Sequence, residues 1–211
     1  MKLSSSSNEN LVHLLSQMGT TPEVEDYLEG RGVTERVRNM FGLGAVNGDC
    51  HREWHRFTGM LAIPYLTVNA PAAMKFRRIT GDGQKYDQPS GQSTHLFNVK
   101  ATFDAGSRLV IVEGEMDAVI MHGECGVPAV AVPGATAWKR HYVRCVDSFE
   151  QVVVLTDRDD AGEGLKLAMK IKAAMPSVRI AELPKGEDVN SFFLKEGKDG
   201  VVDLLPPISV A

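Results

Sequence analysis

The chain has 211 residues, of which 23 are Lys or Arg and 27 are Asp or Glu, so its formal net charge at pH 7 is −4. Hydrophobic residues make up 43% and charged residues 24%, which is typical of a globular protein and excludes a disordered tail, a collagen and a coiled-coil rod. The mild acidity argues at first sight against a nucleic-acid-binding protein, because such domains are usually basic.

Cysteine usage and the N-terminal residues bear on the compartment. The three cysteines, Cys50, Cys125 and Cys145, are far apart and form no CxxC pair, which favours free thiols in a reducing cytoplasm. The first residues are polar where a signal peptide needs an apolar run, and no stretch is apolar enough to span a bilayer. We therefore expect a cytoplasmic protein with no membrane association (host cytoplasm if the chain is phage-encoded).

The first half of the chain predicts short helices followed by strands. Residues 1–20 are expected to be a flexible lead-in with a short helix at 11–18. Thr21 is a good N-cap for a helix that ends at Gly30, and Thr34 is a good N-cap for a second helix over 35–41. Strand-like runs are expected at 60–68 and 72–80, a loop at 81–94 and a further short strand at 95–99.

The second half alternates between apolar runs of strand length and helical patterns. The strands are expected at 108–113, 128–134, 151–157 and 178–183, and the helices at 115–124, 138–149, 161–175 and 189–197. Strands that are apolar throughout and alternate with helices predict a mostly parallel sheet with helices on both faces. The chain is thus predicted to be α/β, with a smaller α+β subdomain at 21–105 and a parallel α/β subdomain at 106–211.

The excess acid lies entirely in the second subdomain. Residues 1–105 contain 11 basic and 11 acidic residues, whereas residues 106–211 contain 12 and 16. Glu113 and Asp157 each directly follow an apolar run, and Asp159 comes two residues later. Because parallel strands open their ligand crevice at their carboxyl ends, these acids are expected to meet there and to bind Mg²⁺ or Mn²⁺. The alternative is that Asp159 or its neighbour simply caps the following helix.

Two motifs in this half carry a family resemblance. VIVEGEMDA (110–118) followed by VLTDRDDAGEG (154–164) resembles the TOPRIM domain, whose signature is a Glu-Gly after one strand and an Asp-x-Asp after a later one. The flanking segments resemble the catalytic core of DnaG-type primases over roughly residues 21–200. The segments that carry this are TPEVEDYLEGRGVTERVRNMFGLG (21–44), MLAIPYL (60–66), FRRITGDGQKYDQPSG (76–91) and LPKGEDVNSFFLKEG (183–197).

The resemblance implies a TOPRIM fold preceded by a primase N-terminal subdomain, and it assigns roles to individual residues. Glu113, Asp157 and Asp159 would be catalytic metal ligands, with Glu113 a candidate general base, and Asp117 and Asp188 would complete the metal-binding patch. Arg77, Arg78 and Lys85 would contact template or nucleotide phosphates. Gly134 would allow the substrate to approach the backbone closely. For these four the alternatives stay open, namely surface charges in water and a plain turn.

The chain also departs from the family pattern at several positions. Asn190 stands where the family often has a second acid, and Met60 replaces an arginine that is often found before the Ile-Pro strand. A family lysine has no clean match near residues 98–100. The sequence contains neither a complete Cys/His zinc module nor a P-loop, and Cys50, His51 and His55 are expected to be structural.

The function implied by the resemblance is that of a DNA-directed RNA primase, a nucleotidyltransferase that uses Mg²⁺ or Mn²⁺. Its partners would be a single-stranded DNA template, ribonucleoside triphosphates, a replicative helicase, and a zinc-binding module supplied by another chain. Three alternatives use the same features less well: a TOPRIM nuclease, a topoisomerase fragment and a non-catalytic replisome DNA-binding protein. A topoisomerase would need a nucleophilic tyrosine in another domain.

Overall fold

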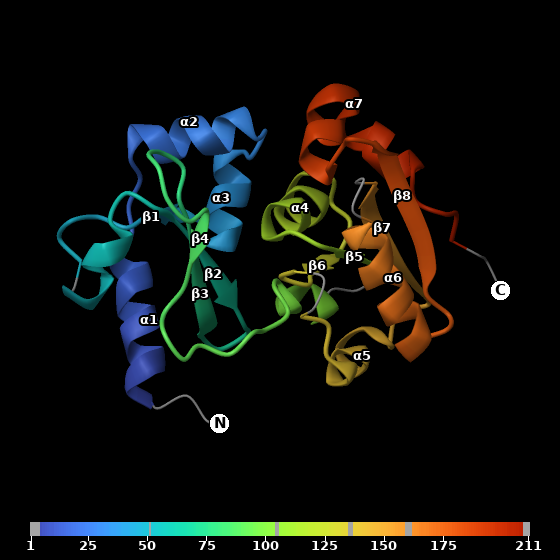
Figure 1. Ribbon diagram of the computed structural model, residues 1–211, viewed down its shortest axis with the longest axis horizontal. Helices are drawn as coiled ribbons and strands as arrows, with labels where there is room; N and C mark the ends of the chain where they lie inside the picture. Colours follow the sequence, from blue (N-terminus) through green and yellow to red (C-terminus); the bar gives the residue numbers. More distant parts are fainter. Residues whose placement is uncertain (1–4, 51, 104–105, 135–136, 159–161, 209–211) are drawn as a thin grey trace. The chain divides into compact units, whose positions relative to one another are not determined.

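The computed structural model describes residues 5–50, 52–103, 106–134, 137–158 and 162–208 (Figure 1). Two compact units make up the chain, residues 1–95 and 96–211. Their boundary precedes the position expected between residues 105 and 106. Residues 97–103 belong to the second unit because Phe97 pairs with Ala131 and the buried Asn98 side chain donates to the Ala129 carbonyl at 2.8 Å.

The first unit is an antiparallel sheet with helices on it. The sheet has the order β1-β2-β3-β4, with β1 at Gly44–Ala45, β2 at Leu61–Leu66, β3 at Pro71–Arg77 and β4 at Tyr86–Asp87. The helices are α1 at Ser5–Gln17, α2 at Pro22–Gly30, α3 at Glu35–Phe41 and a 3-10 helix at Arg52–Phe57. Leu11 and Leu14 of α1 pack into a core with Phe57 and Phe76, whose rings stack at 3.8 Å. This packing extends α1 through residues that were expected to be a flexible lead-in.

Both predicted caps of the first unit are present. Thr21 accepts a hydrogen bond from the Val24 N–H, and Thr34 accepts one from the Val37 N–H. Gly42 ends α3 in the left-handed conformation, with φ of 63°. These local signals set where α2 and α3 begin and where α3 ends, while the buried Val24, Leu28, Val37 and Phe41 anchor both helices to the core.

The free edge of β3 is covered by a side chain. The backbone N–H of Met74 donates to Gln92 Oε1 at 2.8 Å, and Gln92 Nε2 donates to the Met74 carbonyl at 3.0 Å. The Gln92 amide therefore replaces the hydrogen-bonding groups of a neighbouring strand. From Phe76 onward, two residues further along β3, the short strand β4 pairs with this edge instead.

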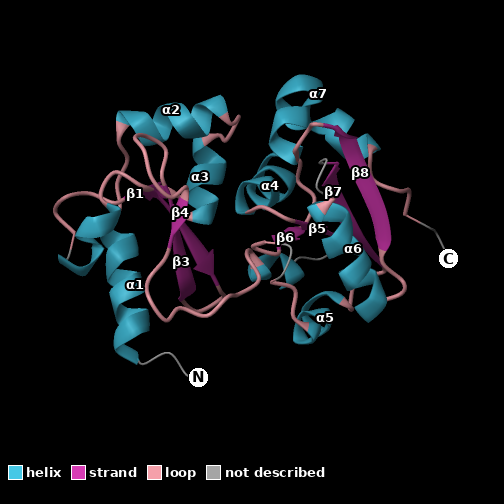
Figure 2. Ribbon diagram, in the orientation of Figure 1, coloured by secondary structure: helices cyan, strands magenta, loops and turns pink. Residues whose placement is uncertain are grey.

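The second unit is a parallel sheet with the order β6-β5-β7-β8 and helices on both faces (Figure 2). Its strands are β5 at Arg108–Val112, β6 at Ala129–Ala131, β7 at Gln151–Arg158 and β8 at Arg179–Lys185. Its helices are α4 at Glu115–Val119, which continues as a π-helix over Ile120–Glu124, α5 at Val143–Val146, α6 at Glu163–Ala174 and α7 at Val189–Asp203; 3-10 helices lie at Val99–Phe103 and Arg140–Tyr142. The parallel α/β architecture predicted from the sequence is confirmed.

The two faces of this sheet have separate cores. Leu109 and Ile111 of β5 point to the face that α5 and α6 cover, where they share one buried cluster with Tyr142 and Ile171. The alternate residues of the strands face α4 and α7, which contact each other. None of the described helices is long and apolar enough to cross a bilayer.

Two expectations on individual elements were wrong. Residues 95–99 do not form a strand; they make one isolated bridge at Phe97, after which Asn98 adopts a left-handed φ of 55° and turns the chain into a 3-10 helix. Most of the predicted helix at 138–149 is replaced by the short elements at Arg140–Tyr142 and Val143–Val146.

At the amino-terminal edge of the second sheet, polar side chains hold the last described residues of the chain. Arg108 Nε donates to Gln151 Oε1 at 2.6 Å, and Gln151 Nε2 donates to the Pro207 carbonyl at 2.9 Å. Arg108 also donates to the Pro206 carbonyl, and burial, together with the nearby Arg179 guanidinium, lowers the pKa of Arg108. Gln151 and Arg108 thus together hold the Pro206–Pro207 segment at this edge of the sheet.

We expect Gln151→Ala to lower the free energy of unfolding by about 1–3 kcal/mol, because the change leaves Arg108 Nε and the Pro207 carbonyl without this partner. Urea denaturation measures the difference. Glu150→Ala is the control, since Glu150 is exposed and directly precedes Gln151. Equal unfolding midpoints for the two variants would show that the link is energetically neutral.

Candidate active site

Glu113 and Asp157 lie at the same edge of the parallel sheet. β5 and β7 are neighbouring strands in register, with Ile111 opposite Val154, and each acid follows two or three residues later. Both carboxylates therefore emerge at the carboxyl ends of adjacent central strands, where parallel sheets bind their ligands. Each of the two side chains is partly exposed, so a solvent-borne ligand can reach them.

Irregular pairing between β7 and β8 occurs at Asp157. Thr156 is opposite Glu182 and Arg158 is opposite Lys185, so two steps along β7 match three along β8. Pro184 lies in the longer stretch and has no N–H to donate to the ladder. Such bulges redirect the side chains next to them and are frequent beside active sites.

Two glycines allow close packing around these acids. A Cβ built on Gly114 would lie 2.5 Å from Asp117 Oδ2, so the buried Asp117 carboxylate folds back against the start of α4. A Cβ built on Gly164 would lie 2.9 Å from the Asp157 carbonyl oxygen, so the first turn of α6 packs directly on the end of β7. The Glu-Gly part of the motif is thus a packing requirement as well as a carboxylate position.

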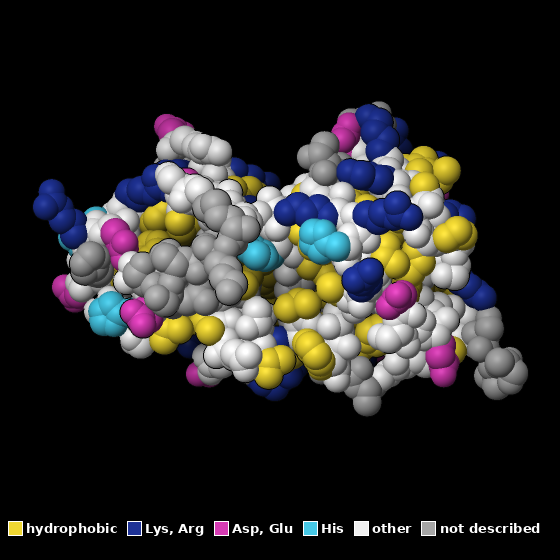
Figure 3. All heavy atoms as spheres, turned by 90° about the horizontal axis from the view of Figure 1, so that it is seen from below, with side chains coloured by type: hydrophobic (Ala, Val, Ile, Leu, Met, Phe, Trp, Pro, Cys, Tyr) yellow, Lys and Arg dark blue, Asp and Glu magenta, His cyan; other side chains and the backbone are white. Residues whose placement is uncertain are grey.

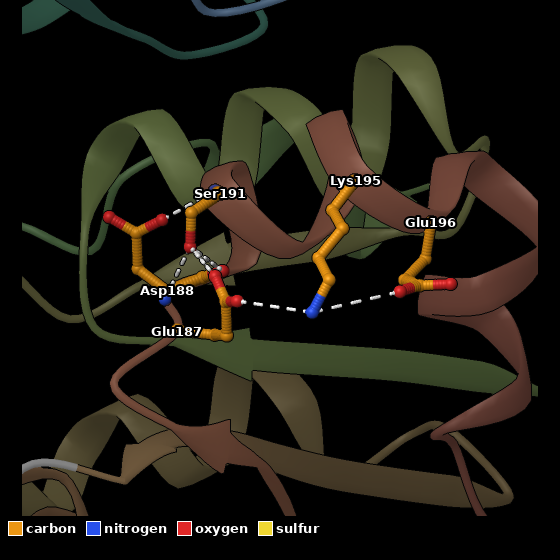
Figure 4. Close-up of polar contacts among 5 residues, drawn as sticks. All are labelled: Glu187, Asp188, Ser191, Lys195 and Glu196. Carbon is orange, nitrogen blue, oxygen red and sulfur yellow. Dashed lines mark hydrogen bonds and ion pairs between the residues drawn. The ribbon is translucent and has the colours of Figure 1, made fainter.

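Asp188, at the start of α7, has a defined structural role. Its Oδ1 accepts from the Ser191 N–H at 2.6 Å, and Ser191 Oγ accepts from the Asp188 N–H at 3.0 Å, which together make a capping box. Figure 4 shows the other carboxylate oxygen of Asp188 pointing away from Ser191. Lys195 lies 3.7 Å from Glu187 and 3.9 Å from Glu196, contacts that add little stability at an exposed surface.

The fourth acid of the predicted cluster, Asp159, lies outside the described residues. Within the described ranges, no three Asp, Glu, His or Cys side chains converge closely enough to hold a metal ion. The structure does place Glu113 and Asp188 after the carboxyl ends of β5 and β8, Asp157 at the carboxyl end of β7, and Asp117 on the helix that follows β5. An all-oxygen donor set of this kind fits Mg²⁺ or Mn²⁺ rather than zinc.

The predicted basic residues all lie in the first unit. Arg77 is the last residue of β3 and is only 8% exposed, whereas Lys85 is exposed just before β4. The Arg78 side chain lies against Gly83, in the loop between β3 and β4. A Cβ built on Gly83 would lie 3.2 Å from Arg78 Nε. Gly134, predicted to allow substrate approach, is exposed in a turn after β6 with φ of 97°.

The cysteines offer no thiolate chemistry to the site. Burial raises the pKa of Cys125 to about 11 and also raises the pKa values of Cys50 and Cys145. All three thiols are therefore protonated at neutral pH. The His55 ring lies 2.9 Å from the Cys50 carbonyl oxygen, so it contacts backbone, as a structural role predicts.

Comparisons with known proteins place the chain in a family. A Toprim domain model matches residues 108–199. Gene 57 protein of Mycobacterium phage D29 is 34% identical over 152 residues, which are 70% of this chain and 98% of that protein. A DNA primase of Myxococcus xanthus is 33% identical over 93% of this chain but only 39% of its own length.

The solved structures show the same fold over nearly the whole chain. A DnaG primase catalytic domain bound to single-stranded DNA has a TM-score of 0.74 and 20% sequence identity, covering 95% of this chain and 82% of that one. The chain therefore belongs to the TOPRIM-domain proteins that have the DnaG-type primase catalytic core. It spans about two fifths of the length of the curated DNA primases of Myxococcus xanthus and Clostridium acetobutylicum that it matches.

Proposed function

We propose that the chain is the catalytic core of a DNA-directed RNA primase, a nucleotidyltransferase that makes short RNA primers on single-stranded DNA. The observation that carries the proposal is the meeting of Glu113 and Asp157 at the carboxyl edge of adjacent central strands, in a DnaG-type fold. Relatives that are named DNA primases and a similar structure bound to single-stranded DNA support it.

The acids at the carboxyl edge would bind divalent cations. TOPRIM primases are generally metal-dependent, and we propose Mg²⁺ or Mn²⁺ for this chain, held by Glu113, Asp117, Asp157, Asp159 and Asp188. When bound, such ions lower the pKa of the attacking hydroxyl and neutralise the phosphates of the leaving group. Glu113 would accept the proton of the primer 3′-hydroxyl, and the other carboxylates would hold the ions that position the triphosphate and its leaving pyrophosphate.

The basic residues of the first unit would bind phosphates. Arg78 and Lys85 would contact the template backbone or the incoming ribonucleoside triphosphate, and Gly134 would line the approach of the nucleotide. Binding through lysine and arginine would be strongly dependent on salt and largely independent of sequence.

The proposed primase function also suggests further partners and a compartment. A DNA helicase/primase of Enterobacteria phage T3 is 35% identical over 103 residues, and on this basis we propose a replicative helicase as a partner. A zinc-binding module supplied by another chain would complete template recognition. The place of action would be the cytoplasm of the host cell.

The test is to incubate the chain with a single-stranded oligonucleotide, ribonucleoside triphosphates and Mg²⁺ or Mn²⁺, and to separate the products on a denaturing gel. We expect RNA products of a few nucleotides that disappear when EDTA is added. Cleavage of the template without RNA synthesis would instead identify a TOPRIM nuclease.

Two substitutions at Asp188 separate metal binding from helix capping. Asp188→Asn should keep the cap, since asparagine caps helices as well as aspartate does, but should lower synthesis by about tenfold or more through loss of a carboxylate. Asp188→Ala should lower both synthesis and the thermal stability of the second unit. Full synthesis by the asparagine variant would limit Asp188 to its capping role.

A further inference from the structure

A buried arginine lies between two tyrosine rings in the first unit. The guanidinium carbon of Arg77 is 5.1 Å from the ring centroid of Tyr27, on α2, and 5.2 Å from that of Tyr86, on β4. Arg77 also donates a hydrogen bond to the Tyr86 hydroxyl. In the described part of the chain, Arg77 Nε is buried and has no hydrogen-bond partner. Among the residues that the structure describes, two tyrosine rings and one tyrosine hydroxyl are therefore the main partners of this charge.

Other cations lie over the same two rings. Lys75 Nζ is 4.3 Å and Lys85 Nζ is 5.8 Å from the Tyr86 centroid, and the Arg31 guanidinium carbon is 5.3 Å from the Tyr27 centroid. Positive groups this close repel one another, and the negative faces of the rings offset that repulsion. Removing one ring would therefore drive the cations and their backbone segments apart.

The segment that depends most on these ring contacts is the loop at residues 78–85. Its ends meet through a hydrogen bond from the Arg78 N–H to the Lys85 carbonyl, at 2.9 Å. The strand that anchors it, β4, has only two residues, and one of them is Tyr86, which is opposite Arg77 in the ladder. So short a strand needs side-chain contacts to remain paired.

We infer that Arg77 and Tyr27 are positioning residues that act through Tyr86 to hold the 78–85 loop, so that Arg78 and Lys85 meet a phosphate backbone as a preformed pair. The low exposure of Arg77 argues against direct contact with nucleic acid, whereas Lys85 is exposed. The identity of the ligand rests on the proposed primase function; the ordering of the loop does not.

Hydrogen exchange tests the loop without any nucleic acid. In Tyr27→Leu, the Arg78 amide should exchange roughly tenfold faster than in the wild type, as expected for the loss of about 1.4 kcal/mol of cation–π contact. Tyr27→Phe keeps the ring and is the matched control, with wild-type exchange. Unchanged exchange in the leucine variant, or equal acceleration in both variants, would overturn the inference.

The salt dependence of binding to single-stranded DNA tests how Arg77 acts. Tyr27→Leu and Arg77→Met should weaken binding by about three- to tenfold at one salt concentration with little change in the slope of log affinity against log salt. Lys85→Gln should reduce that slope by about 0.7, because it removes a phosphate contact. An equal reduction in Arg77→Met would make Arg77 a contact residue and overturn its positioning role.

The two experiments also separate the inference from the proposed function. A wild-type chain that fails to bind single-stranded DNA, together with faster Arg78 exchange in Tyr27→Leu, would overturn the primase proposal and support the loop inference. Normal binding of single-stranded DNA by the wild type, together with unchanged Arg78 exchange in Tyr27→Leu, would leave the primase proposal standing and overturn the loop inference.

Discussion

Glu113→Gln and Asp157→Asn should each reduce primer synthesis by about a hundredfold or more while leaving template binding intact or stronger. Each substitution replaces a proposed metal ligand by an uncharged group of the same shape, so the loss should come from chemistry and not from packing. Removal of a negative charge lowers the repulsion of a polyanion, so binding should be measured without divalent ions as well as with them. The measurements are the rate of RNA synthesis on a single-stranded template and the anisotropy of a labelled oligonucleotide.

Matched controls exist at positions away from the carboxyl edge. Glu150 is exposed and directly precedes β7, at the opposite end of that strand from Asp157, and Asp147 is exposed directly after α5. Glu150→Gln and Asp147→Asn change the charge of the chain by the same amount and should keep wild-type synthesis. Wild-type synthesis in Glu113→Gln or Asp157→Asn would remove those residues from the active site.

The second large effect is expected from Gly164→Ala. Alanine favours a helix over glycine by about 1 kcal/mol, so local propensity alone would make this change stabilising. Contact with the Asp157 carbonyl oxygen, 2.9 Å from the added Cβ, should reverse that sign, because a backbone atom cannot turn away as a side chain can. We expect a net loss of about 1–3 kcal/mol in the free energy of unfolding and a fall in synthesis as Asp157 shifts.

Gly30→Ala is the control for this change. Gly30 is the last residue of α2, and a Cβ there would have no neighbour within 4 Å. It should be neutral or slightly stabilising in the same denaturation experiment. A Gly164→Ala variant that is more stable than the wild type would mean that α6 can move away from β7 at no cost.

The sequence predicted elements well where the signals are local. Thr21 and Thr34 cap their helices as expected, because an N-cap depends only on residues within one turn. The apolar runs that became β5 and β7 have strand length and alternate with helical patterns, and the pairing of these two strands places Glu113 and Asp157 at the same edge of the sheet. The general position of the candidate site therefore followed from the sequence.

What the sequence missed depends on distant partners. The two-residue strand β4 has no periodic pattern, and the side-chain contacts that hold it come from distant residues: Arg77 donates to the Tyr86 hydroxyl, and Arg56 donates to Asp87. Asp188 resembled a metal ligand, but it also directly precedes the predicted helix at 189–197, where an aspartate can act as N-cap, and the structure shows one of its oxygens bound to the Ser191 N–H. The close contact of Gly164 with Asp157 likewise becomes visible only in three dimensions.

The distribution of charge over the surface is a further feature that the sequence totals did not reveal. The second half of the chain is acidic in total, yet its exposed surface carries many cations, among them Lys139, Arg140, Arg144, Lys166 and Lys170. Figure 3 shows Lys and Arg side chains gathered on the side of this unit on which α5 lies. Net charge alone could not exclude an enzyme that works on nucleic acid, because it does not report how the charges are distributed over the surface.

The amide of Gln92 has a consequence for solubility. A strand edge with unsatisfied N–H and C=O groups is a template on which a second molecule can add a strand, and repetition of that step leads to aggregation. At Met74 both groups are already occupied by one side chain of the same molecule. The sheet of the first unit is therefore closed to intermolecular strand addition at this point, without a further strand.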